Sequence, residues 1–341
     1  MEKFVIEGGH RLEGTVRASG SKNEALPVLA ATLLSDQPIT LHNVPRIEDV
    51  LVLLEIIEAI GGTATWTGEN TVVVNNRGVA NGAVPMELCR KLRASILLAG
   101  PLLARFGEVE LPPPGGDVIG RRRLDTHFLS ADRLDAADIF LDEPSVTGTE
   151  NIVMAAVLAR GTTTIRNAAC EPHVQGLCTM LNTLGARIEG VGTNTLVIHG
   201  TKGLWGGEHT IGPDYLEVGS YIGLAAMTGS AIRIEGARRS DLRMIGLVFQ
   251  KLGVDLNVLD DAVVVPGDQK PRIRNDFMNQ IPKIDDAPWP MFPTDMMSIA
   301  ITTATQCDGT VMFFEKMFDG RMFFTDSLVG MGARIILCDP H

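Results

Sequence analysis

The sequence predicts an α/β protein built as two similar globular domains, and three observations lead there. The chain has 341 residues, enough for two domains that each bury an apolar core. Hydrophobic residues make up 45% and charged residues 21%, which is typical of a folded globular protein. One pattern of strand, helix and two strands recurs along the chain. Each copy is too small to bury its apolar face alone, so the copies are expected to assemble.

The repeated unit has recognisable punctuation. A short strand rich in Val, Ile and Thr leads through an Asn-Val-Pro or Asn-Ala turn into a helix with apolar residues three and four apart. The helix ends near Leu-Gly-Ala, where glycine is a common stop, and two strands follow. Copies are expected at Pro38–Val74, Gly161–His199, Ser230–Val265 and from Gly309 onward, the last with a strand at Arg334–Cys338.

A second kind of helix links one copy to the next. The strand Gly14–Ala18 precedes the first of these helices, and the N-terminal stretch Met1–Glu7 runs straight into alternating, strand-like sequence. The linking helices are expected at Asn23–Leu34, Pro85–Leu103, Val146–Ala159, Leu216–Met227 and Pro293–Thr305.

Two copies look incomplete. A helix is expected to begin after Arg121–His127, but the chain then runs directly through Phe128–Ser130 without a Leu-Gly-Ala stop or a pair of strands. The chain also stops at His341, soon after the first strand of the last hairpin. One unit is therefore expected to be shortened and the last one to be missing.

Composition excludes several classes of function. The net charge of −11 and a pI near 5.1 argue against nucleic acid as a partner, so an anionic ligand needs a local cluster of Arg and Lys. The five cysteines are scattered and the histidines lack ligand spacing, which predicts neither disulfides nor a bound metal. No membrane span is expected, and the N-terminus has no signal-like apolar core, which predicts a cytoplasmic protein.

Two segments have the chemistry of anion sites. Ser19–Asn23 is a Gly/Ser turn at a helix start, where free N–H groups and Lys22 favour an anion, although a capped helix with a solvated lysine is the plain alternative. Leu111–His127 has three prolines, three glycines and three arginines, which suits a lid that neutralises phosphate. Its plain alternative is a surface turn with a solvated basic run.

Three further positions are ambiguous from the sequence alone. Arg93 opens an apolar helix and is either a phosphate ligand or a surface charge. Asp295 stands in Pro-Thr-Asp at a helix start, where capping is the default role. Asp319-Gly320-Arg321 is by default an ordinary surface turn.

Taken in order, these segments resemble the UDP-N-acetylglucosamine 1-carboxyvinyltransferase family, which belongs to the EPSP synthase superfamily. The marks are Gly20-Ser21-Lys22-Asn23, Arg93-Ala94-Ser95, Pro114 to Arg122, Asn167 to Pro172 and Phe292 to Met296. The resemblance implies two inside-out α/β, barrel-like domains, each built from βαβαββ units. One would comprise 1–21 plus 213–341, and the other 22–212 with a lid loop at 112–123.

The resemblance also implies a reaction without a cofactor. The enolpyruvyl group of phosphoenolpyruvate would pass to the 3-hydroxyl of UDP-N-acetylglucosamine with loss of phosphate, the first committed step of peptidoglycan synthesis. Lys22, Arg93 and Arg122 would hold phosphoenolpyruvate, and Asn23 and Asp295 would contact the sugar, with Asp295 as base. The catalytic set would be Lys22, Asp117 and Asp295. The remaining substrate contacts would come from Arg123, Leu124, Asp125, His127, Ser145, Val146, Met317 and Arg321. Substrate binding would draw the domains together and close the lid, excluding water; protein partners are not predicted.

The sequence departs from the commonest family pattern in ways that bear on function. Asp117 stands where many members have a cysteine, which predicts insensitivity to the thiol-alkylating epoxide fosfomycin. Asp319-Gly320-Arg321 replaces a common Glu-Asn-Arg, and the shortened and missing units lead us to expect impaired activity. Two alternatives remain at this stage: a 3-phosphoshikimate 1-carboxyvinyltransferase-like enzyme, and a truncated, non-catalytic paralogue that binds a nucleotide sugar.

Overall fold

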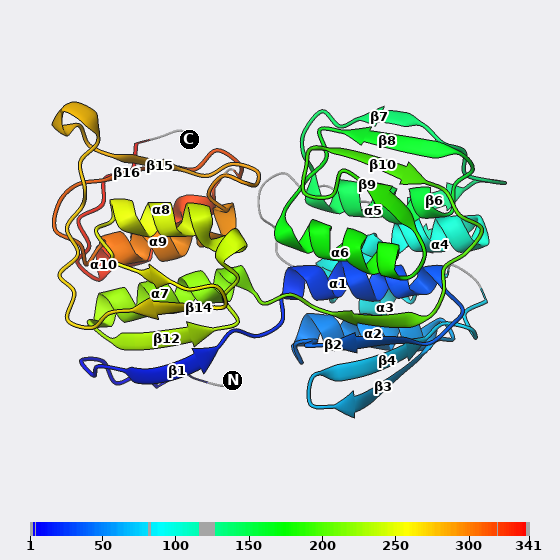
Figure 1. Ribbon diagram of the computed structural model, residues 1–341, viewed down its shortest axis with the longest axis horizontal. Coiled ribbons are helices and arrows are strands. Elements are labelled where there is room, and N and C mark those ends of the chain that lie inside the picture. The colour runs from blue at the N-terminus through cyan, green and yellow to red at the C-terminus, as the bar shows by residue number, and fades with distance from the viewer. Residues whose placement is uncertain (1–2, 4, 81–82, 116–126, 319, 339–341) are drawn as a thin grey trace. The chain divides into compact units, whose positions relative to one another are not determined.

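The computed structural model describes residues 3, 5–80, 83–115, 127–318 and 320–338, with the side chains of 127 and 128 left aside. The chain divides into two compact units, unit 1 (Met1–Ser19 with Pro213–His341) and unit 2 (Gly20–Gly212) (Figure 1). The chain passes from unit 1 to unit 2 between Ser19 and Gly20, and returns between Gly212 and Pro213; we call these two points the crossings. The first crossing lies two residues before the position suggested by the resemblance. Backbone hydrogen bonds tie both crossings within each unit: Asp214 N donates to Ser19 O and Ser21 N donates to Gly212 O, each at 2.8 Å.

Unit 2 holds most of the regular structure. Its helices, including short 3₁₀ turns (η), are α1 (Lys22–Ala31), η1 (Thr32–Leu34), α2 (Glu48–Ala59), α3 (Met86–Cys89), η2 (Arg93–Leu98), α4 (Ala99–Phe106), α5 (Val146–Val157) and α6 (Pro172–Thr183). Its strands are β2 (Ile39–His42), β3 (Thr63–Gly68), β4 (Thr71–Asn75), β5 (Glu108–Leu111), β6 (His127–Ser130), β7 (Asp138–Phe140), β8 (Thr162–Arg166), β9 (Arg187–Glu189), β10 (Thr195–His199) and β11 (Gly207–Thr210).

Unit 1 repeats the same kinds of element. Its helices are α7 (Tyr215–Thr228), η3 (Arg239–Leu242), α8 (Arg243–Lys251), η4 (Phe277–Asn279), η5 (Thr294–Met296), α9 (Met297–Ala304), η6 (Arg321–Phe324) and α10 (Thr325–Gly330). Its strands are β1 (Glu13–Arg17), β12 (Ala231–Glu235), β13 (Asn257–Val258), β14 (Ala262–Val265), β15 (Lys283–Asp285) and β16 (Met312–Phe314).

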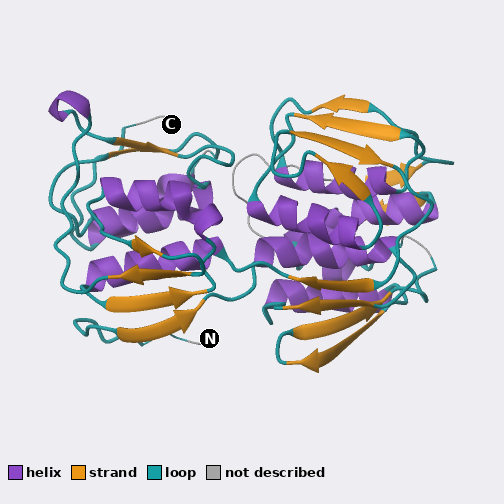
Figure 2. Ribbon diagram, viewed as in Figure 1, coloured by secondary structure: helices purple, strands orange, loops and turns teal. Residues whose placement is uncertain are grey.

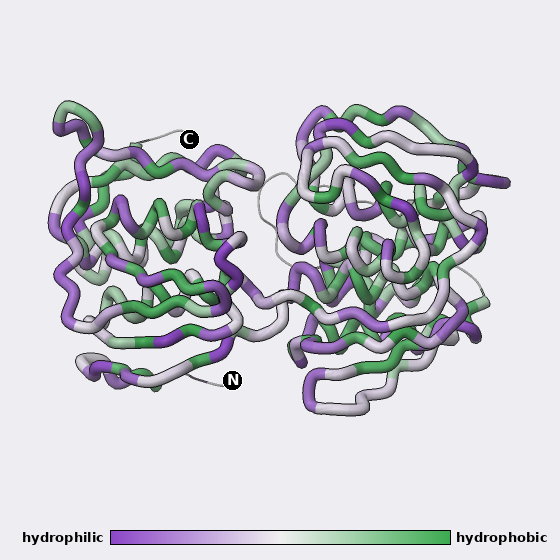
Figure 3. The backbone as a smooth tube through the Cα atoms, viewed as in Figure 1, coloured by the Kyte–Doolittle hydropathy of each residue, from purple (hydrophilic) through white to green (hydrophobic). Residues whose placement is uncertain are grey.

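Three four-stranded sheets share one topology, in which a parallel pair is followed by two antiparallel neighbours. Their strand orders are β1-β12-β14-β13, β11-β2-β4-β3 and β7-β8-β10-β9. In each unit the helices lie between sheets, so the domains are inside-out as expected (Figure 2). Helix α1 shows why: every residue from Glu24 to Ala31 is buried, as a helix at the centre of a domain requires. The hydropathy trace places many hydrophilic segments in the peripheral loops (Figure 3).

The repeat punctuation has a conformational basis. Asn43, Asn167 and Gly236 each follow the first strand of a copy and have φ between 56° and 72°, a left-handed conformation that Asn and Gly tolerate best. The two asparagines use their amides as well, since Asn43 Nδ2 donates to Ile211 O and Asn167 Nδ2 to Leu141 O. The turn residues therefore join neighbouring strands.

Four local expectations were wrong. Residues 127–130 do not begin a helix. They form strand β6, which is antiparallel to β5, because β5 offers backbone groups to pair with. Residues 334–338 and the described residues before Glu13 are not strands, since no described strand pairs with them there, and Val5 and Ile6 are more than four-fifths exposed. The single helix expected at 85–103 is broken into α3, η2 and α4.

The shortened unit appears as a reduced sheet. Among the described residues, strands β5 and β6 pair only with each other, and a single bridge joins Ala83 to Glu110. From Ser130 the chain reaches β7 at Asp138 without an intervening helix. The described stretch between β6 and β7 therefore lacks the helix and hairpin of the complete copies.

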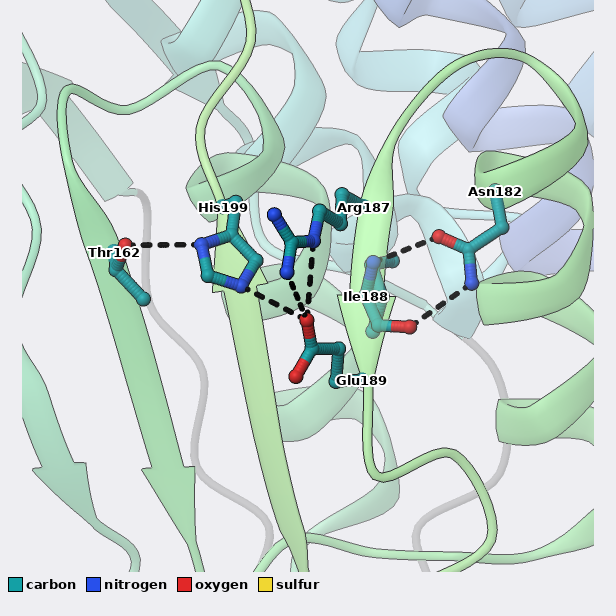
Figure 4. A network of polar contacts seen from close by, with 6 residues as sticks. All are labelled: Thr162, Asn182, Arg187, Ile188, Glu189 and His199. Atoms are coloured by element: carbon teal, nitrogen blue, oxygen red, sulfur yellow. Dashed lines mark hydrogen bonds and ion pairs between the residues drawn. The ribbon is translucent and has the colours of Figure 1, made fainter.

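A surface network fixes the β8-β10-β9 sheet (Figure 4). Glu189 Oε1 accepts from Arg187 Nη2 at 2.7 Å and lies 3.3 Å from His199 Nε2. The Arg187 guanidinium lowers the pKa of the Glu189 carboxyl, with a smaller contribution from His199. Nearby, the Asn182 amide accepts from Ile188 N and donates to Ile188 O, which locks α6 to β9. None of the described helices is long and apolar enough to cross a membrane.

Candidate functional site

The start of helix α1 is a tightly packed backbone turn that presents Lys22 and Asn23. A Cβ on Gly20 would lie 1.7 Å from Asn43 O, so only glycine is possible there. Ser21 is the N-cap residue, and its side chain makes no capping hydrogen bond, which leaves the first N–H groups of α1 unpaired by it. The geometry is that of an anion-binding helix terminus.

Glu24 anchors this turn from beneath. Its carboxyl is buried, lies 2.9 Å from His209 Nε2 and accepts from Gly212 N at 3.1 Å. Gly176 leaves the necessary room, because a Cβ there would lie 2.3 Å from the carboxyl carbon. Glu24 thus fixes the backbone that carries Lys22 and Asn23.

The Lys22 ammonium is exposed and held weakly. Its Nζ lies 3.1 Å from Asp49 Oδ2, and both side chains are more than 40% exposed. Such a pair contributes about 0–1 kcal/mol to stability, so an incoming anion can compete for the lysine.

Arg93 lies close to the root of the predicted lid. It is half-buried at the start of η2, which packs against α1, and it has no ion-pair partner within the described ranges. Gly115 N donates to Cys89 O at 2.9 Å, and a Cβ on Gly115 would lie 1.5 Å from Arg90 O. Gly115, the last described residue in the first part of the predicted lid loop, is therefore fixed against Cys89 and Arg90, which lie four and three positions before Arg93.

Ser145 and Val146 form a second helix terminus in unit 2. Ser145 Oγ accepts from Gly148 N at 3.1 Å and caps α5, which also packs against η2. Val146 is half-buried as the first residue of this twelve-residue helix. Its position suits a contact with a diphosphate.

In unit 1, Asp295 and Arg321 form an ion pair. Arg321 Nη2 lies 2.5 Å from Asp295 Oδ1, and the guanidinium stacks 5.5 Å from the ring centre of Phe318. The default roles were therefore wrong: Pro293 occupies the cap position, Asp295 makes no cap, and Arg321 is four-fifths buried rather than a surface charge. The ion pair therefore links η5 to η6, although the two residues are 26 positions apart in the sequence.

Buried carboxyls lie directly behind this pair. Glu315 accepts from Met317 N and Phe318 N at 3.1 Å each and from Thr294 Oγ1 at 3.2 Å. Desolvation, together with the neighbouring Asp286, raises the pKa of Glu315 to about 7. Met317 itself is half-exposed.

The predicted residues divide between the two units. Lys22, Asn23, Arg93, Ser145 and Val146 belong to unit 2, whereas Asp295, Met317 and Arg321 belong to unit 1. Asp117, Arg122, Arg123, Leu124 and Asp125 lie outside the described residues, and of His127 only the backbone is described. Sequence reasoning missed Glu24, Asp286 and Glu315. Only Glu24 had a signal, as an acid in the first turn of a helix, and that signal indicates a helix-dipole role instead.

No group of three or more His, Cys, Asp or Glu side chains suited to a metal ion occurs among the described residues. Desolvation raises the pKa of Cys178 to about 12 and of Cys307 to about 11, which keeps these thiols protonated and unreactive near neutral pH. The chemistry of the described residues therefore comes from Lys22 and Arg93, at the starts of α1 and η2, and from the Asp295–Arg321 pair.

Comparison with known proteins places the chain in a family. The family model described as EPSP synthase (3-phosphoshikimate 1-carboxyvinyltransferase) matches residues 6–136 and 126–338. The chain belongs to this family of carboxyvinyl transferases, and its two matched segments overlap where the shortened unit lies.

Curated relatives specify the branch. The UDP-N-acetylglucosamine 1-carboxyvinyltransferase of Bradyrhizobium diazoefficiens is 54% identical over 99% of this chain and 83% of its own length. The enzyme of that name from Treponema denticola is 53% identical over 100% of this chain and 84% of its own. The chain is thus a member of the UDP-N-acetylglucosamine 1-carboxyvinyltransferases, and the family expected from the sequence motifs is confirmed.

Solved structures agree on the fold. The enolpyruvyl transferase NikO from Streptomyces tendae is 25% identical, with a TM-score of 0.85 over 98% of this chain and 82% of NikO. An EPSP synthase from Acinetobacter baumannii has 15% identity and a TM-score of 0.66 over 91% of this chain and 75% of its own, which shows the fold alone. The expected inside-out fold class is confirmed.

Proposed function

We propose that the protein transfers the enolpyruvyl group of phosphoenolpyruvate to the 3-hydroxyl of UDP-N-acetylglucosamine and releases phosphate. The observation that carries this proposal is the identity of 54% and 53%, over nearly the whole chain, with relatives named for that reaction. With it go a role in peptidoglycan synthesis, and so in cell shape and division, and a cytoplasmic location.

Anion binding falls to unit 2 together with the lid. Lys22 offers a full positive charge at an uncapped helix start, and Arg93 is free of ion pairs with the described residues. Both suit the phosphate and carboxylate of phosphoenolpyruvate, with Arg122 supplying a third charge. The N-terminus of α5, at Ser145 and Val146, suits the diphosphate, alongside Arg123, Leu124, Asp125 and His127.

Proton transfer falls to carboxyl groups. Asp295 takes the proton of the sugar hydroxyl while the hydroxyl oxygen attacks C2 of phosphoenolpyruvate. Arg321 fixes the orientation of the Asp295 carboxylate. Asp117 delivers a proton to C3, which completes the addition. Elimination then breaks the C2–O bond to phosphate and removes a proton from C3, so the reaction balances without a cofactor. Asn23 and Met317 contact the sugar side.

Calorimetric titration separates this proposal from the alternatives. We expect UDP-N-acetylglucosamine to bind and phosphoenolpyruvate to tighten that binding, whereas shikimate 3-phosphate gives no heat of binding. Tight binding of shikimate 3-phosphate would favour the other branch of the family. Binding of the nucleotide sugar that phosphoenolpyruvate does not alter would favour a non-catalytic paralogue.

A further inference from the structure

Glu315 connects the two segments that carry the Asp295–Arg321 pair. On one side its carboxyl accepts from the hydroxyl of Thr294, the neighbour of Asp295. On the other side it accepts from Met317 N and Phe318 N, and Phe318 stacks on Arg321. Glu315 is only 7% exposed, so these contacts are made away from water.

Asp286 lies beside Glu315 and is completely buried. Its Oδ1 accepts from Lys316 N at 2.7 Å, but its Oδ2 has no donor among the described residues. A buried acceptor left unpaired is costly, and two buried carboxylates in contact repel each other. A single proton held between Asp286 and Glu315 removes both penalties.

The cations near Asp286 and Glu315 are paired with other carboxylates and do not neutralise these two. Lys283 of β15 and Lys316, the second residue after β16, both pair with Asp285 instead. From η5 and η6, Asp295 and Arg321 pair with each other. Within the described part of the chain, no cation forms an ion pair with Asp286 or Glu315, so a proton is the available neutralising charge.

We propose that Asp286 and Glu315 are positioning residues that share one proton and hold Asp295 against Arg321, oriented to receive the proton of the acceptor hydroxyl. The inference rests on the proposed function and deepens it. Neither carboxyl touches substrate in this account. Both act through Thr294 on one segment and through the Met317–Phe318 backbone on the other.

The test compares two substitutions of Glu315. Glu315→Gln reproduces the protonated carboxyl, with an oxygen for the Met317 and Phe318 amides and an N–H for Asp286. Glu315→Ala removes all of these contacts. We expect kcat within about threefold of the wild type for the Gln variant and about 10- to 100-fold lower for the Ala variant. KM for both substrates should change less than about threefold, because the anion-binding groups are untouched. Asp308→Asn, an exposed acid on the same unit, serves as the control.

Crystal structures of both variants supply a readout that does not depend on turnover. The Asp295–Arg321 contact should persist in the Gln variant and open in the Ala variant. The inference is overturned if the Ala variant keeps the contact or keeps wild-type kcat. Loss of kcat in the Gln variant equal to that in the Ala variant would also overturn it, since the charge and not the shared proton would then matter.

A milder variant covers failure of Glu315→Ala to fold. Thr294→Val deletes only the hydroxyl that joins Asp295's segment to Glu315, and we expect a 3- to 10-fold fall in kcat with unchanged thermal stability. An unchanged kcat would refute the positioning role. A wild-type protein without any transfer activity would instead refute the proposed function, and the crystallographic comparison would still decide the role of Asp286 and Glu315.

Discussion

Lys22 combines an exposed charge with a rigid backbone, and this combination makes its function separable from folding. We expect Lys22→Ala to lower turnover by more than about 100-fold while changing stability by about 0–1 kcal/mol, because its ion pair with Asp49 is exposed. Steady-state kinetics and thermal unfolding check both parts. Asp49→Ala is the matched control, since it breaks the same ion pair but leaves Lys22 in place to bind the anion. Normal turnover in a folded Lys22→Ala protein would remove Lys22 from the site.

Asp117 stands where the resemblance to the family implies a cysteine in many members, and a carboxylate attacks an epoxide far more slowly than a thiolate. We expect no covalent adduct when the protein is incubated with fosfomycin and UDP-N-acetylglucosamine and its lid peptide is analysed by mass spectrometry. Asp117→Cys should form the adduct. An adduct on the wild-type lid peptide would contradict the expected insensitivity.

The sequence predicted the helix start at Lys22 and Asn23, where the signal was local. Lys22 and Asn23 sit in a Gly/Ser turn that fixes their surroundings within a few residues. Asp295 was expected to cap its helix because its partner Arg321 is 26 residues away, and no local pattern reveals that pairing. Glu315 and Asp286 could not be predicted for the same reason, since their shared burial arises only when β15 and β16 pair.

At the scale of elements, the start of the predicted lid loop depends on Gly115. Gly115→Ala places a methyl group 1.5 Å from Arg90 O, so the backbone must shift, at a cost of about 1–3 kcal/mol. We expect lower thermal stability and reduced turnover, because the loop leaves its anchor beside Arg93. Gly203→Ala, where a Cβ meets nothing within 4 Å, should change neither. Equal behaviour of the two variants would show that the anchor is unimportant.

The β15–β16 region should make stability depend on pH. Burial raises the pKa of Glu315 to about 7 from an ordinary 4.5. Between these two pH values the folded protein retains a proton on Glu315 that the unfolded chain releases. Its stabilising effect is therefore present below about pH 4.5 and is lost as the pH rises to about 7. Asp286 faces this group directly, while Lys283 and Lys316 are paired with Asp285.

Calorimetric melting from pH 4.5 to 8 checks this pH dependence. As the pH rises from about 4.5 to about 7, the free energy of unfolding of the wild type should fall relative to that of Glu315→Gln. The slope should be at most that of one released proton, roughly 1.4 kcal/mol per pH unit. Above about pH 7 the two curves should run parallel. Parallel curves throughout would mean that Glu315 titrates normally.

Helices and strands were predictable where the spacing of apolar residues agreed with the positions of the turn and helix-stop residues. The copies at 38–74, 161–199 and 230–265 appear with their helices and strands in place, because glycines and asparagines at fixed positions adopt positive φ. Residues 334–338 have strand-like composition but no described neighbour to pair with, and 127–130 found such a neighbour in β5. Strand formation depends on partners that lie elsewhere in the chain, which a local pattern does not specify.

At the scale of the whole molecule, the repeat predicted two units, and the crossings at 19/20 and 212/213 divide the proposed chemistry between them. Unit 2 carries the helix termini that we propose bind anions, and unit 1 carries the Asp295–Arg321 pair. The claim that joins these parts is transfer of an enolpyruvyl group to a nucleotide sugar.

Product analysis tests that claim most directly. The wild-type protein is incubated with phosphoenolpyruvate and either UDP-N-acetylglucosamine or shikimate 3-phosphate, and released phosphate and product mass are measured together. We predict phosphate release only with UDP-N-acetylglucosamine, in equal amount to a nucleotide sugar that has gained one enolpyruvyl group, and loss of both in Lys22→Ala. Absence of that product from a folded protein that binds both substrates, or its formation on shikimate 3-phosphate instead, would contradict the account.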